Sequence, residues 1–447
     1  MAQASVSPVH ALLRRLHFYI GLFVGPFLFI AALTGVAYAL TPQLERWLYA
    51  EALYTPSQGQ PLPLAEQVQR ARDELPAEFA VAAVRPASAP GHTTRVMFSV
   101  PGLGASENRA LFIDPVTGEV RGDMKVYGTS GVLPLRTWLD QVHRGLLLGD
   151  AGRLYSELAA SWLWVVALGG LYLWWRRPPA KGRRGGLRAL HSSTGLWLLL
   201  GLMFFSATGL TWSQYAGDNI GVLRNQFGMG TPSVNTTLAA DPHAQHSGGE
   251  HAEHHMAMPM VGQAPALKPA LFDQALAAAR AAGLHAGKIE IRPALAAGKA
   301  WTVTEIDRGW PTHVDAVAID PSDLRIVDRT EFEHFPLAAK LTRWGIDAHM
   351  GSLFGVANQV LLVVVGTGLA AMVVMGYLMW WRRRPALRQG PTLIDAWRAM
   401  GRAGQGGWVL AAVLLGVSLP VLGVSLVLLL VVDGWLTLRP AAQPALG

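Results

Sequence analysis

Long apolar runs alternate along this chain with segments in which apolar and polar residues are mixed. Five of these runs are long enough to cross about 30 Å of hydrocarbon at about 1.5 Å of helix per residue. They predict membrane helices over residues 18–40, 141–175, 191–212, 346–381 and 408–432. The first run exceeds the roughly 7–15 apolar residues of a signal peptide. We therefore favour a membrane helix over a cleaved signal ending near Ala37-Tyr38-Ala39.

The two longest mixed segments, 41–140 and 213–345, have the patterns of small α+β modules. Helical spacing covers Leu64–Leu75 in the first and Pro269–Ala282 in the second. Strand-like runs follow at Ala80–Val84, Arg95–Val100 and Arg109–Ile113, and at Lys288–Arg292, Ala300–Glu305 and Val314–Ile319. Each module also contains an Ile-Asp-Pro turn, which indicates two copies of one fold.

The membrane segments repeat as well. The stretch from Arg14 to Gly35 returns from Arg188 to Gly209, and the stretch from Trp138 to Trp175 returns from Trp344 to Trp381, each at a constant spacing. Matching positions include Leu16/Leu190, His17/His191, Thr34/Thr208, His143/His349, Gly145/Gly351 and Gly170/Gly376. A unit of span, outer module and span therefore occurs twice. We predict a polytopic α-helical membrane protein with a four-helix core from two tandem repeats, a fifth C-terminal helix and two outer α+β modules.

Positive charge assigns the sides of the membrane. Lysine and arginine concentrate in the short segments 1–17, 176–190 and 382–407, which contain one acid, Asp395. These segments are predicted to be cytoplasmic, because short cytoplasmic loops are rich in Lys and Arg. The modules at 41–140 and 213–345 and the tail 433–447 are then outside.

Composition supports a membrane protein and limits its chemistry. The 447 residues are 51% apolar and 15% charged, and cysteine is absent. The absence of cysteine excludes disulfides, thiolate metal sites, iron–sulfur clusters and covalent haem attachment. The net charge of +7 follows from the topology, so no nucleic-acid partner is expected.

Four histidines occupy duplicated positions at the ends of spans. By topology His17 and His191 lie on the cytoplasmic side, and His143 and His349 on the outer side. Two imidazoles from opposed helices suit the axial positions of a haem b iron. A lone interfacial histidine is more often a hydrogen-bonded polar residue, but the duplication favours two non-covalent bis-histidine haem sites.

Neighbouring glycines and arginines fit these sites. Glycines near the histidines would give a flat ring room, at Gly21, Gly25, Gly35, Gly145, Gly149, Gly195, Gly209, Gly351 and Gly355. Arginines that could pair with haem propionates are Arg14, Arg15 and Arg188 inside and Arg136, Arg144 and Arg343 outside. A continuous helix from His143 to Trp175 would exceed a ~30 Å core, so the outer haem is expected to be reachable from outside.

A loop at residues 241–260 is rich in histidine and methionine and has no hydrophobic period. Its ligand types suit copper or another soft-to-borderline metal, and the alternative is a linker with accidental bias. The candidate metal ligands are His243, His246, His251, His254, His255, Met256 and Met258.

These motifs resemble the PepSY-associated transmembrane proteins, which include bacterial ferric-siderophore reductases. The resemblance rests on the His-to-Thr-Gly spans, the His-x-Gly-x-x-x-Gly spans ending in YLWW or YLMWW, and the Ile-Asp-Pro turns, over about residues 10–385. It implies a bacterial inner-membrane oxidoreductase with two periplasmic PepSY modules, in which electrons pass outward to a ferric siderophore. The fifth span and the His/Met loop depart from that pattern and leave another metal chelate possible.

No dinucleotide-binding motif occurs in a strand-to-helix context, so an external electron donor is expected, either a cytoplasmic reductase or a quinol. Two other functions remain open at this point. One is a transporter or permease for a metal complex, since repeats are common in transporters. The other is a membrane-anchored PepSY module that senses or inhibits a partner.

Overall fold

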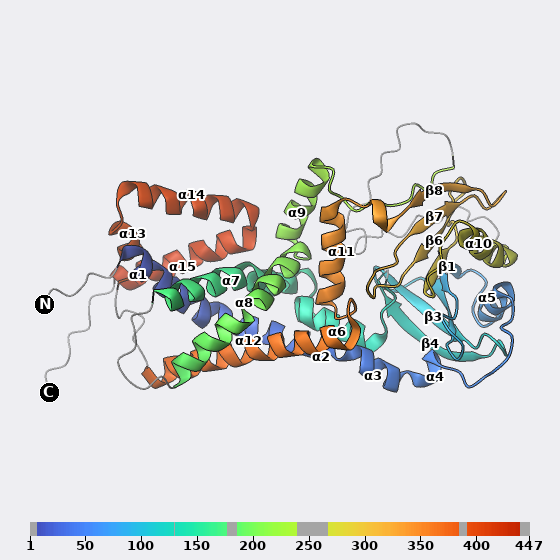
Figure 1. Ribbon diagram of the computed structural model, residues 1–447, viewed down its shortest axis with the longest axis horizontal. Coiled ribbons are helices and arrows are strands. Elements are labelled where there is room, and N and C mark those ends of the chain that lie inside the picture. Colours follow the sequence, from blue (N-terminus) through green and yellow to red (C-terminus); the bar gives the residue numbers. More distant parts are fainter. Residues whose placement is uncertain (1–6, 129, 177–185, 239–266, 384–390, 439–447) are drawn as a thin grey trace, which may run out of the picture. The chain divides into compact units, whose positions relative to one another are not determined.

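A computed structural model describes residues 7–128, 130–176, 186–238, 267–383 and 391–438 (Figure 1). The chain divides into two compact units. One contains Met1–Ala37, Gln141–Ile220 and Val360–Gly447, and the other contains Tyr38–Asp140 and Gly221–Gln359. The first unit is helical, and the second contains a β-sheet.

Four helices are long and apolar enough to cross a membrane. They are Pro8–Ala39, which comprises α1 (Pro8–Tyr19), a π-helical turn (Ile20–Val24) and α2 (Gly25–Ala39), then α7 (Gly149–Trp175), α8 (Leu187–Thr211) and α12 (Gly355–Arg383). These are the first four predicted spans, and the chain is a membrane protein with a lipid bilayer as its surroundings. Aliphatic side chains on their outer faces remain exposed, as expected for surfaces in contact with lipid.

The π-helical turn begins three residues after His17. A π-turn leaves a backbone carbonyl without its usual helical partner. Here the hydroxyl of Tyr377 on α12 donates to the carbonyl of Leu22 at 2.6 Å. Gly25 lies beside Tyr377, and an added Cβ there would be 3.4 Å from the Tyr377 ring. The first membrane helix is thereby tied to α12.

The predicted span over 141–175 is wrong as one continuous helix. The chain forms α6 (Pro134–Gly145) and then α7, with a turn between them. Leu146, Leu147 and Gly149 have φ of 53°, 61° and 60°, a left-handed conformation that ends an α-helix. His143 therefore lies on α6, and the helical distance from His143 to Trp175 no longer applies.

The second half has the same interruption. The predicted span over 346–381 is divided into α11 (Leu337–His349) and α12, and His349 is the last residue of α11. Gly351 and Gly355 have φ of 74° and 58°, which only glycine adopts without strain. Both outer histidines therefore precede the long apolar helices.

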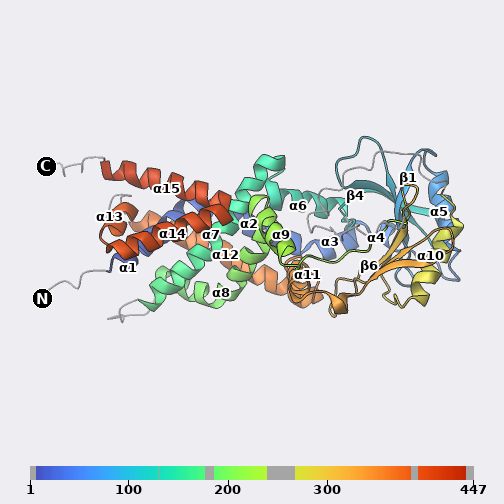
Figure 2. The same ribbon diagram turned by 90° about the horizontal axis from the view of Figure 1, so that it is seen from above.

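The predicted single fifth span over 408–432 is also wrong. The chain forms two helices there, α14 (Arg402–Ser418) and α15 (Pro420–Leu438), which lie side by side (Figures 1 and 2). Pro420 cannot continue α14, because its ring clashes with the preceding turn and it has no N–H. Gly416 and Gly423 let the two backbones approach, since a Cβ on Gly423 would lie 2.7 Å from the Gly416 Cα. The result is a helical hairpin.

The hairpin returns the chain to the end from which α1 begins. Asp433 on α15 is fully buried and accepts hydrogen bonds from the Tyr19 hydroxyl at 2.7 Å and the Ile394 N–H at 3.0 Å. Ile394 belongs to the short helix α13 (Leu393–Arg398), which packs against α1. Asp433 near the end of α15 thus lies beside α1, and the predicted side of the tail 433–447 stays a prediction. The rest of the predicted tail lies outside the described residues.

The second unit contains one eight-stranded antiparallel sheet in the order β4-β3-β2-β1-β5-β6-β7-β8. The strands are β1 (Ala80–Arg85), β2 (Thr94–Ser99), β3 (Glu107–Ile113), β4 (Val120–Tyr127), β5 (Ile289–Arg292), β6 (Trp301–Glu305), β7 (Ala316–Ile319) and β8 (Ile326–Thr330). Six of them match predicted runs. The edge strands β4 and β8 were not predicted, because they are polar and mostly uncovered.

The two halves of the sheet have the same order of elements, one helix before four strands. Helices α5 (Leu64–Asp73) and α10 (Ala270–Ala281) cover the same face over a shared apolar core (Figure 1). The halves join where β1 pairs with β5. Arg85 and Glu290 form a buried ion pair at 2.5 Å across this seam. The predicted two modules are therefore two halves of one continuous sheet.

The duplicated Ile-Asp-Pro turns differ in burial. Burial alone would raise the pKa of the Asp114 carboxyl, but four hydrogen bonds lower it to about 2. They come from the hydroxyls of Ser57 and Thr55 and the backbone N–H groups of Val116 and Thr117. Its counterpart Asp320 is partly exposed, and its carboxylate accepts from the backbone N–H and the hydroxyl of Ser322. Asp114 is thus a structural residue of the first half.

Three shorter helices follow the first and third membrane helices. The helices α3 (Thr41–Leu48) and α4 (Ala50–Leu53) follow α2, and α9 (Tyr215–Gln226) follows α8. The N-terminus of α9 is capped from α7, where the buried carboxylate of Glu157 accepts from the N–H groups of Tyr215 and Ala216, each at 3.0 Å. This buried carboxylate therefore has a structural role.

Candidate functional site

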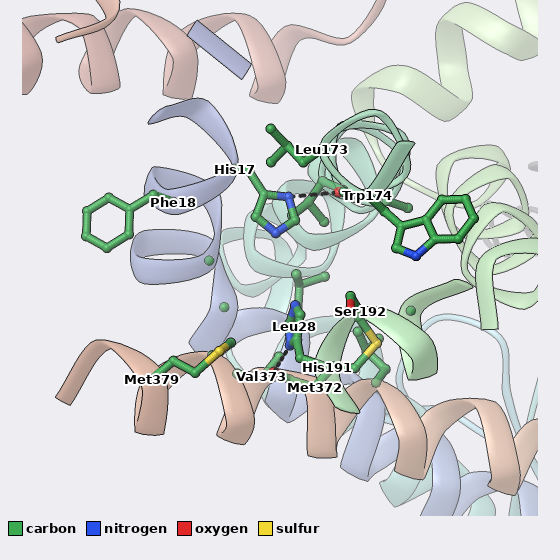
Figure 3. Close-up of a pocket in the computed structure, with 18 of the residues that line it drawn as sticks. His17, Phe18, Leu28, Leu173, Trp174, His191, Ser192, Met372, Val373 and Met379 are labelled. Atoms are coloured by element: carbon green, nitrogen blue, oxygen red, sulfur yellow. Dashed lines mark hydrogen bonds between the residues drawn. The ribbon is translucent and has the colours of Figure 1, made fainter. Parts of the chain in front are cut away.

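A cavity of about 410 Å³ lies inside the membrane unit. All four long helices line it, and its walls are mostly apolar. Figure 3 shows His17 and His191 reaching into it from different helices. The volume is in the range of about 300–1,000 Å³ that is typical of ligand pockets in proteins. The predicted inner histidines therefore meet at one internal site.

His17 is held by α7. Its Nδ1 lies 3.1 Å from the carbonyl oxygen of Val166 (Figure 3). Gly170, one turn further along α7, lets the ring lie against the helix, because a Cβ there would be 3.2 Å from His17 Cε1. The imidazole thus packs on bare backbone and cannot rotate freely.

His191 is held by α12 in the same way. Its Nδ1 lies 3.1 Å from the carbonyl oxygen of Met372. Val166 and Met372 occupy matching positions in the two halves of the chain, as His17 and His191 do. The two histidines therefore use equivalent backbone acceptors on equivalent helices.

These contacts decide which ring nitrogen is free. A peptide carbonyl can only accept, so Nδ1 of each ring is the protonated donor. The Nε2 atoms of His17 and His191 then keep their lone pairs. Histidines that bind metals commonly donate their other N–H to a carbonyl in this way.

The separation of the rings suits one metal between them. The ring centroids of His17 and His191 are 6.4 Å apart and the planes are inclined by 89°. Two metal–nitrogen bonds of about 2 Å, with about 1.1 Å from each nitrogen to its ring centre, give about 6 Å. The measured separation of the ring centroids is close to this value.

Positive charge lines one end of the cavity. Arg14 and Arg188 each precede a histidine by three residues, which puts them one turn away on the same helix face. Arg383, at the end of α12, also lines the cavity. Apolar walls with guanidinium groups at one end suit a flat apolar ligand that carries acidic groups.

For the predicted outer pair, His143 and His349, the structure gives the surroundings of His143 alone. His143 packs against α2, where a Cβ on Gly35 would lie 3.2 Å from its Cε1. Its Nδ1 lies 2.9 Å from the hydroxyl oxygen of Thr34. His349 belongs to the other unit, so its pairing with His143 stays a prediction.

The glycines have more specific positions than expected. Gly21 faces the cavity and Gly35 and Gly170 face imidazole rings from a neighbouring helix. Gly145 instead lies in backbone contact with Gly152 at the α6–α7 turn. The predicted role of Gly145 as space beside a ring is therefore wrong, because its helix face is covered by α7.

Two of the predicted outer arginines are held by carboxylates. Arg136 pairs with Glu45 at 2.8 Å, and Arg343 pairs with Asp347 at 3.0 Å. Arg15, predicted at the inner site, is buried over the Tyr19 ring and does not line the cavity. Of the predicted inner arginines, Arg14 and Arg188 are the two at the site.

The candidate metal ligands of the His/Met loop, from His243 to Met258, lie outside the described residues. Within the ranges that the structure covers, no group of three or more His, Cys, Asp or Glu side chains is placed to hold a metal ion.

Sequence reasoning missed the acceptors of the histidine N–H groups. Val166 and Met372 act through backbone carbonyls, so their side chains give no sign of the role. The sequence did show Thr34 as a duplicated residue, next to the duplicated Gly35. It gave no other sign that Thr34 contacts a histidine. A search for polar residues beside duplicated glycines would have found it.

The comparisons with known proteins identify one family. The sequence profile of a family described as the PepSY-associated TM region matches residues 14–383. A search of curated proteins found no match to this chain. The matched region begins at Arg14 and ends with α12, so it includes the cavity and the sheet, and α13–α15 follow it.

Proposed function

The chain belongs to the PepSY-associated TM family, and from that premise we propose that it is a bacterial inner-membrane oxidoreductase. It carries electrons across the membrane and reduces a periplasmic ferric siderophore or another metal chelate. Two non-covalent b-type haems are held by His17 with His191 and by His143 with His349. Bound haem iron supplies a one-electron couple, which the side chains of this protein lack.

The observation that supports this proposal best is the matched pair of hydrogen bonds at the inner site. His17 and His191 both direct Nδ1 to a backbone carbonyl, at Val166 and Met372, and leave Nε2 for a metal. A histidine that only snorkels or stabilises the fold would not need a second histidine 6.4 Å away with the same hydrogen bond. A site in which two histidines bind one metal requires both features.

The cavity provides the remaining requirements of such a site. Apolar side chains from four helices line the cavity, and burial against them would stabilise an apolar macrocycle. Arg14, Arg188 and Arg383 at one end can pair with carboxylates, as guanidinium groups do. The residues present therefore fit the proposed group.

The side of the membrane follows from charge. The arginine-rich segments 1–17, 176–190 and 382–407 are cytoplasmic in this proposal, and the sheet unit, as two PepSY modules, is periplasmic. The sheet unit would then present the surface to which the metal chelate binds. Reduction releases iron, because hard oxygen chelators hold ferrous iron less tightly than ferric iron. A cytoplasmic reductase or a membrane quinol must supply the electrons.

Electron transfer can be tested in proteoliposomes that enclose a reductant, with a ferric siderophore outside and a chelator that reports ferrous iron. The wild-type protein is expected to reduce the external iron, and His17→Ala to abolish that reduction. His10→Ala is the matched control, because His10 is on the same helix and does not line the cavity.

Three outcomes would contradict the proposal. Iron reduction by His17→Ala at the wild-type rate would remove the inner site from the reaction. Accumulation of the intact chelate inside the vesicles, without reduction, would favour the transporter. An absence of both activities would favour a sensing or inhibitory module.

A further inference from the structure

An exposed aromatic cluster lies beside the start of α12. The ring centroid of Trp310 is 5.5 Å from that of Trp344 and 5.9 Å from that of Phe354. Trp310 and Phe354 are each 57% exposed. Contact with water is unfavourable for such large apolar groups, so a contiguous patch of them commonly marks a surface that binds a protein or a membrane.

The fold holds Trp310 in this exposed position. Trp310 belongs to the loop between β6 and β7, and its backbone N–H donates to the carbonyl oxygen of Leu353 at 2.8 Å. The loop is closed by a β-bridge between Asp307 and His313. Trp344, which the Trp310 ring contacts, packs in turn on the buried Phe332, with 5.7 Å between the ring centroids. The Trp310 ring is therefore fixed at the surface from two sides.

Helix α11 extends the cluster. Leu337, Leu341 and Trp344 follow one another at spacings of four and three residues, which puts them on one face of the helix. Leu337 is 68% exposed and Leu341 is 57% exposed. The one acidic residue of α11, Asp347, is fully buried and paired with Arg343, so its charge is not on this face. We call the five apolar residues the α11 surface: Trp310, Leu337, Leu341, Trp344 and Phe354.

The α11 surface is continuous with the lipid-facing surface of α12. Phe354 directly precedes α12, which is long and apolar enough to cross a membrane. Val356 and Val360, in the first turns of α12, are 62% and 56% exposed, as side chains in contact with lipid are. Phe354 and the Trp310 ring beside it are therefore at the edge of the hydrocarbon. Tryptophan is enriched there, because its ring is apolar and its N–H is polar.

We infer that the α11 surface binds the lipid bilayer, in the headgroup region of the leaflet at which α12 begins. Helices that lie in this region carry Trp and Leu on one face and basic residues elsewhere. In α11 the basic residues are Lys340 and Arg343, which suit lipid phosphates. The continuity with α12 favours lipid over a partner protein. This contact gives the sheet unit an attachment to the membrane in addition to its chain connections.

The absence of cysteine makes this contact measurable, since single cysteines can carry a nitroxide spin label. The label sites are Leu337→Cys, Leu341→Cys and Gly309→Cys, next to Trp310. A Cβ on Gly309 would be 3.6 Å from the Asp307 carboxylate, an ordinary contact. Each full-length variant is reconstituted in vesicles of phosphatidylethanolamine and phosphatidylglycerol. Electron paramagnetic resonance then measures the accessibility of the label to oxygen, which concentrates in lipid, and to a water-soluble nickel chelate.

Two further sites provide the references. Val364→Cys is the lipid reference, because Val364 is 54% exposed within α12. Glu119→Cys is the water reference, because Glu119 is exposed at the Ile-Asp-Pro turn of the first half of the sheet. The ratio of oxygen to nickel accessibility at the three label sites should exceed the ratio at Glu119 and approach the ratio at Val364.

A ratio at the Glu119 level at any of the three sites would overturn the inference, because that site would be in water. Low accessibility to both reagents would also overturn it, since protein, such as a second copy of the chain, would then cover the surface. Neither result depends on bound haem, so the test is independent of the proposed function.

Discussion

The imidazole rings of His17 and His191 lie with their centroids 6.4 Å apart and their planes inclined by 89°. Each ring is oriented by a backbone carbonyl of the long helix it faces, α7 for His17 and α12 for His191. Four helices thus meet at one site, two that carry a histidine and two that supply a backbone carbonyl. The site exists only when both halves of the membrane unit are assembled.

Gly170 is predicted to be essential for the position of His17. Gly170→Ala would put a methyl group 3.2 Å from His17 Cε1 and push the ring into the cavity. The affinity of the inner site for haem should fall by about 10-fold, as it does for other changes beside metal ligands. The haem content should therefore fall from two per chain toward one. The measurement is haem per polypeptide after purification.

Gly376 provides the control for this change. It occupies the matching position on α12 and lines the same cavity, but an added Cβ there would meet no imidazole ring within 4 Å. Gly376→Ala should therefore lower the haem content less than Gly170→Ala does. Equal losses in both variants would show that the effect comes from helix packing and would contradict the specific contact with His17.

The C-terminal hairpin predicts the sidedness of the chain ends. A reporter fused after Leu438 should lie on the same side of the membrane as the start of α1, because Asp433 is bonded to Tyr19. A reporter fused after Ser418, at the end of α14, should lie on the opposite side. Paired fluorescent-protein and phosphatase fusions, which are active on opposite sides, measure this. Two fusions on the same side would contradict the hairpin.

Asp114 should contribute to the stability of the sheet unit in a pH-dependent way. Its folded pKa of about 2 is below the ordinary value of 3.8. The contribution is therefore complete above about pH 4 and is lost as the pH falls toward 2. At pH 7, Asp114→Asn should cost about 2 kcal/mol, from about 1.4 kcal/mol per pKa unit.

Thermal unfolding of the sheet, followed by circular dichroism of the full-length protein, measures this cost. The difference between wild type and Asp114→Asn should narrow below pH 4. Asp320→Asn, at the partly exposed second turn, should have a smaller effect at pH 7. A constant difference from pH 7 to pH 3 would show that the carboxylate charge is not the cause.

Much of this architecture could be predicted from hydrophobic pattern. The four long helices are long apolar runs, six of the eight strands coincide with short strand-like runs, and the duplication of His17 and His191 marked their site. The edge strands β4 and β8 could not be found in that way, because neither is covered on both faces. The pairing of β1 with β5, which joins the two halves of the sheet, could not be predicted either, because the two strands are far apart in the sequence.

Turns caused the errors in the membrane unit. Leu146 and Leu147 adopt left-handed φ, for which leucine gives no warning, so the end of α6 was invisible. The break at Pro420 had a signal, since a proline flanked by Gly416 and Gly423 inside an apolar run favours a turn. Hydropathy alone joined the two helices into one span.

The optical spectrum of the purified protein, air-oxidised and then reduced with dithionite, tests the central claim most directly when haem is counted per chain. The account predicts two low-spin b-type haems per polypeptide. His17→Ala and His191→Ala should each remove the same one, and His143→Ala the other. A colourless protein purified from cells well supplied with haem would contradict the account.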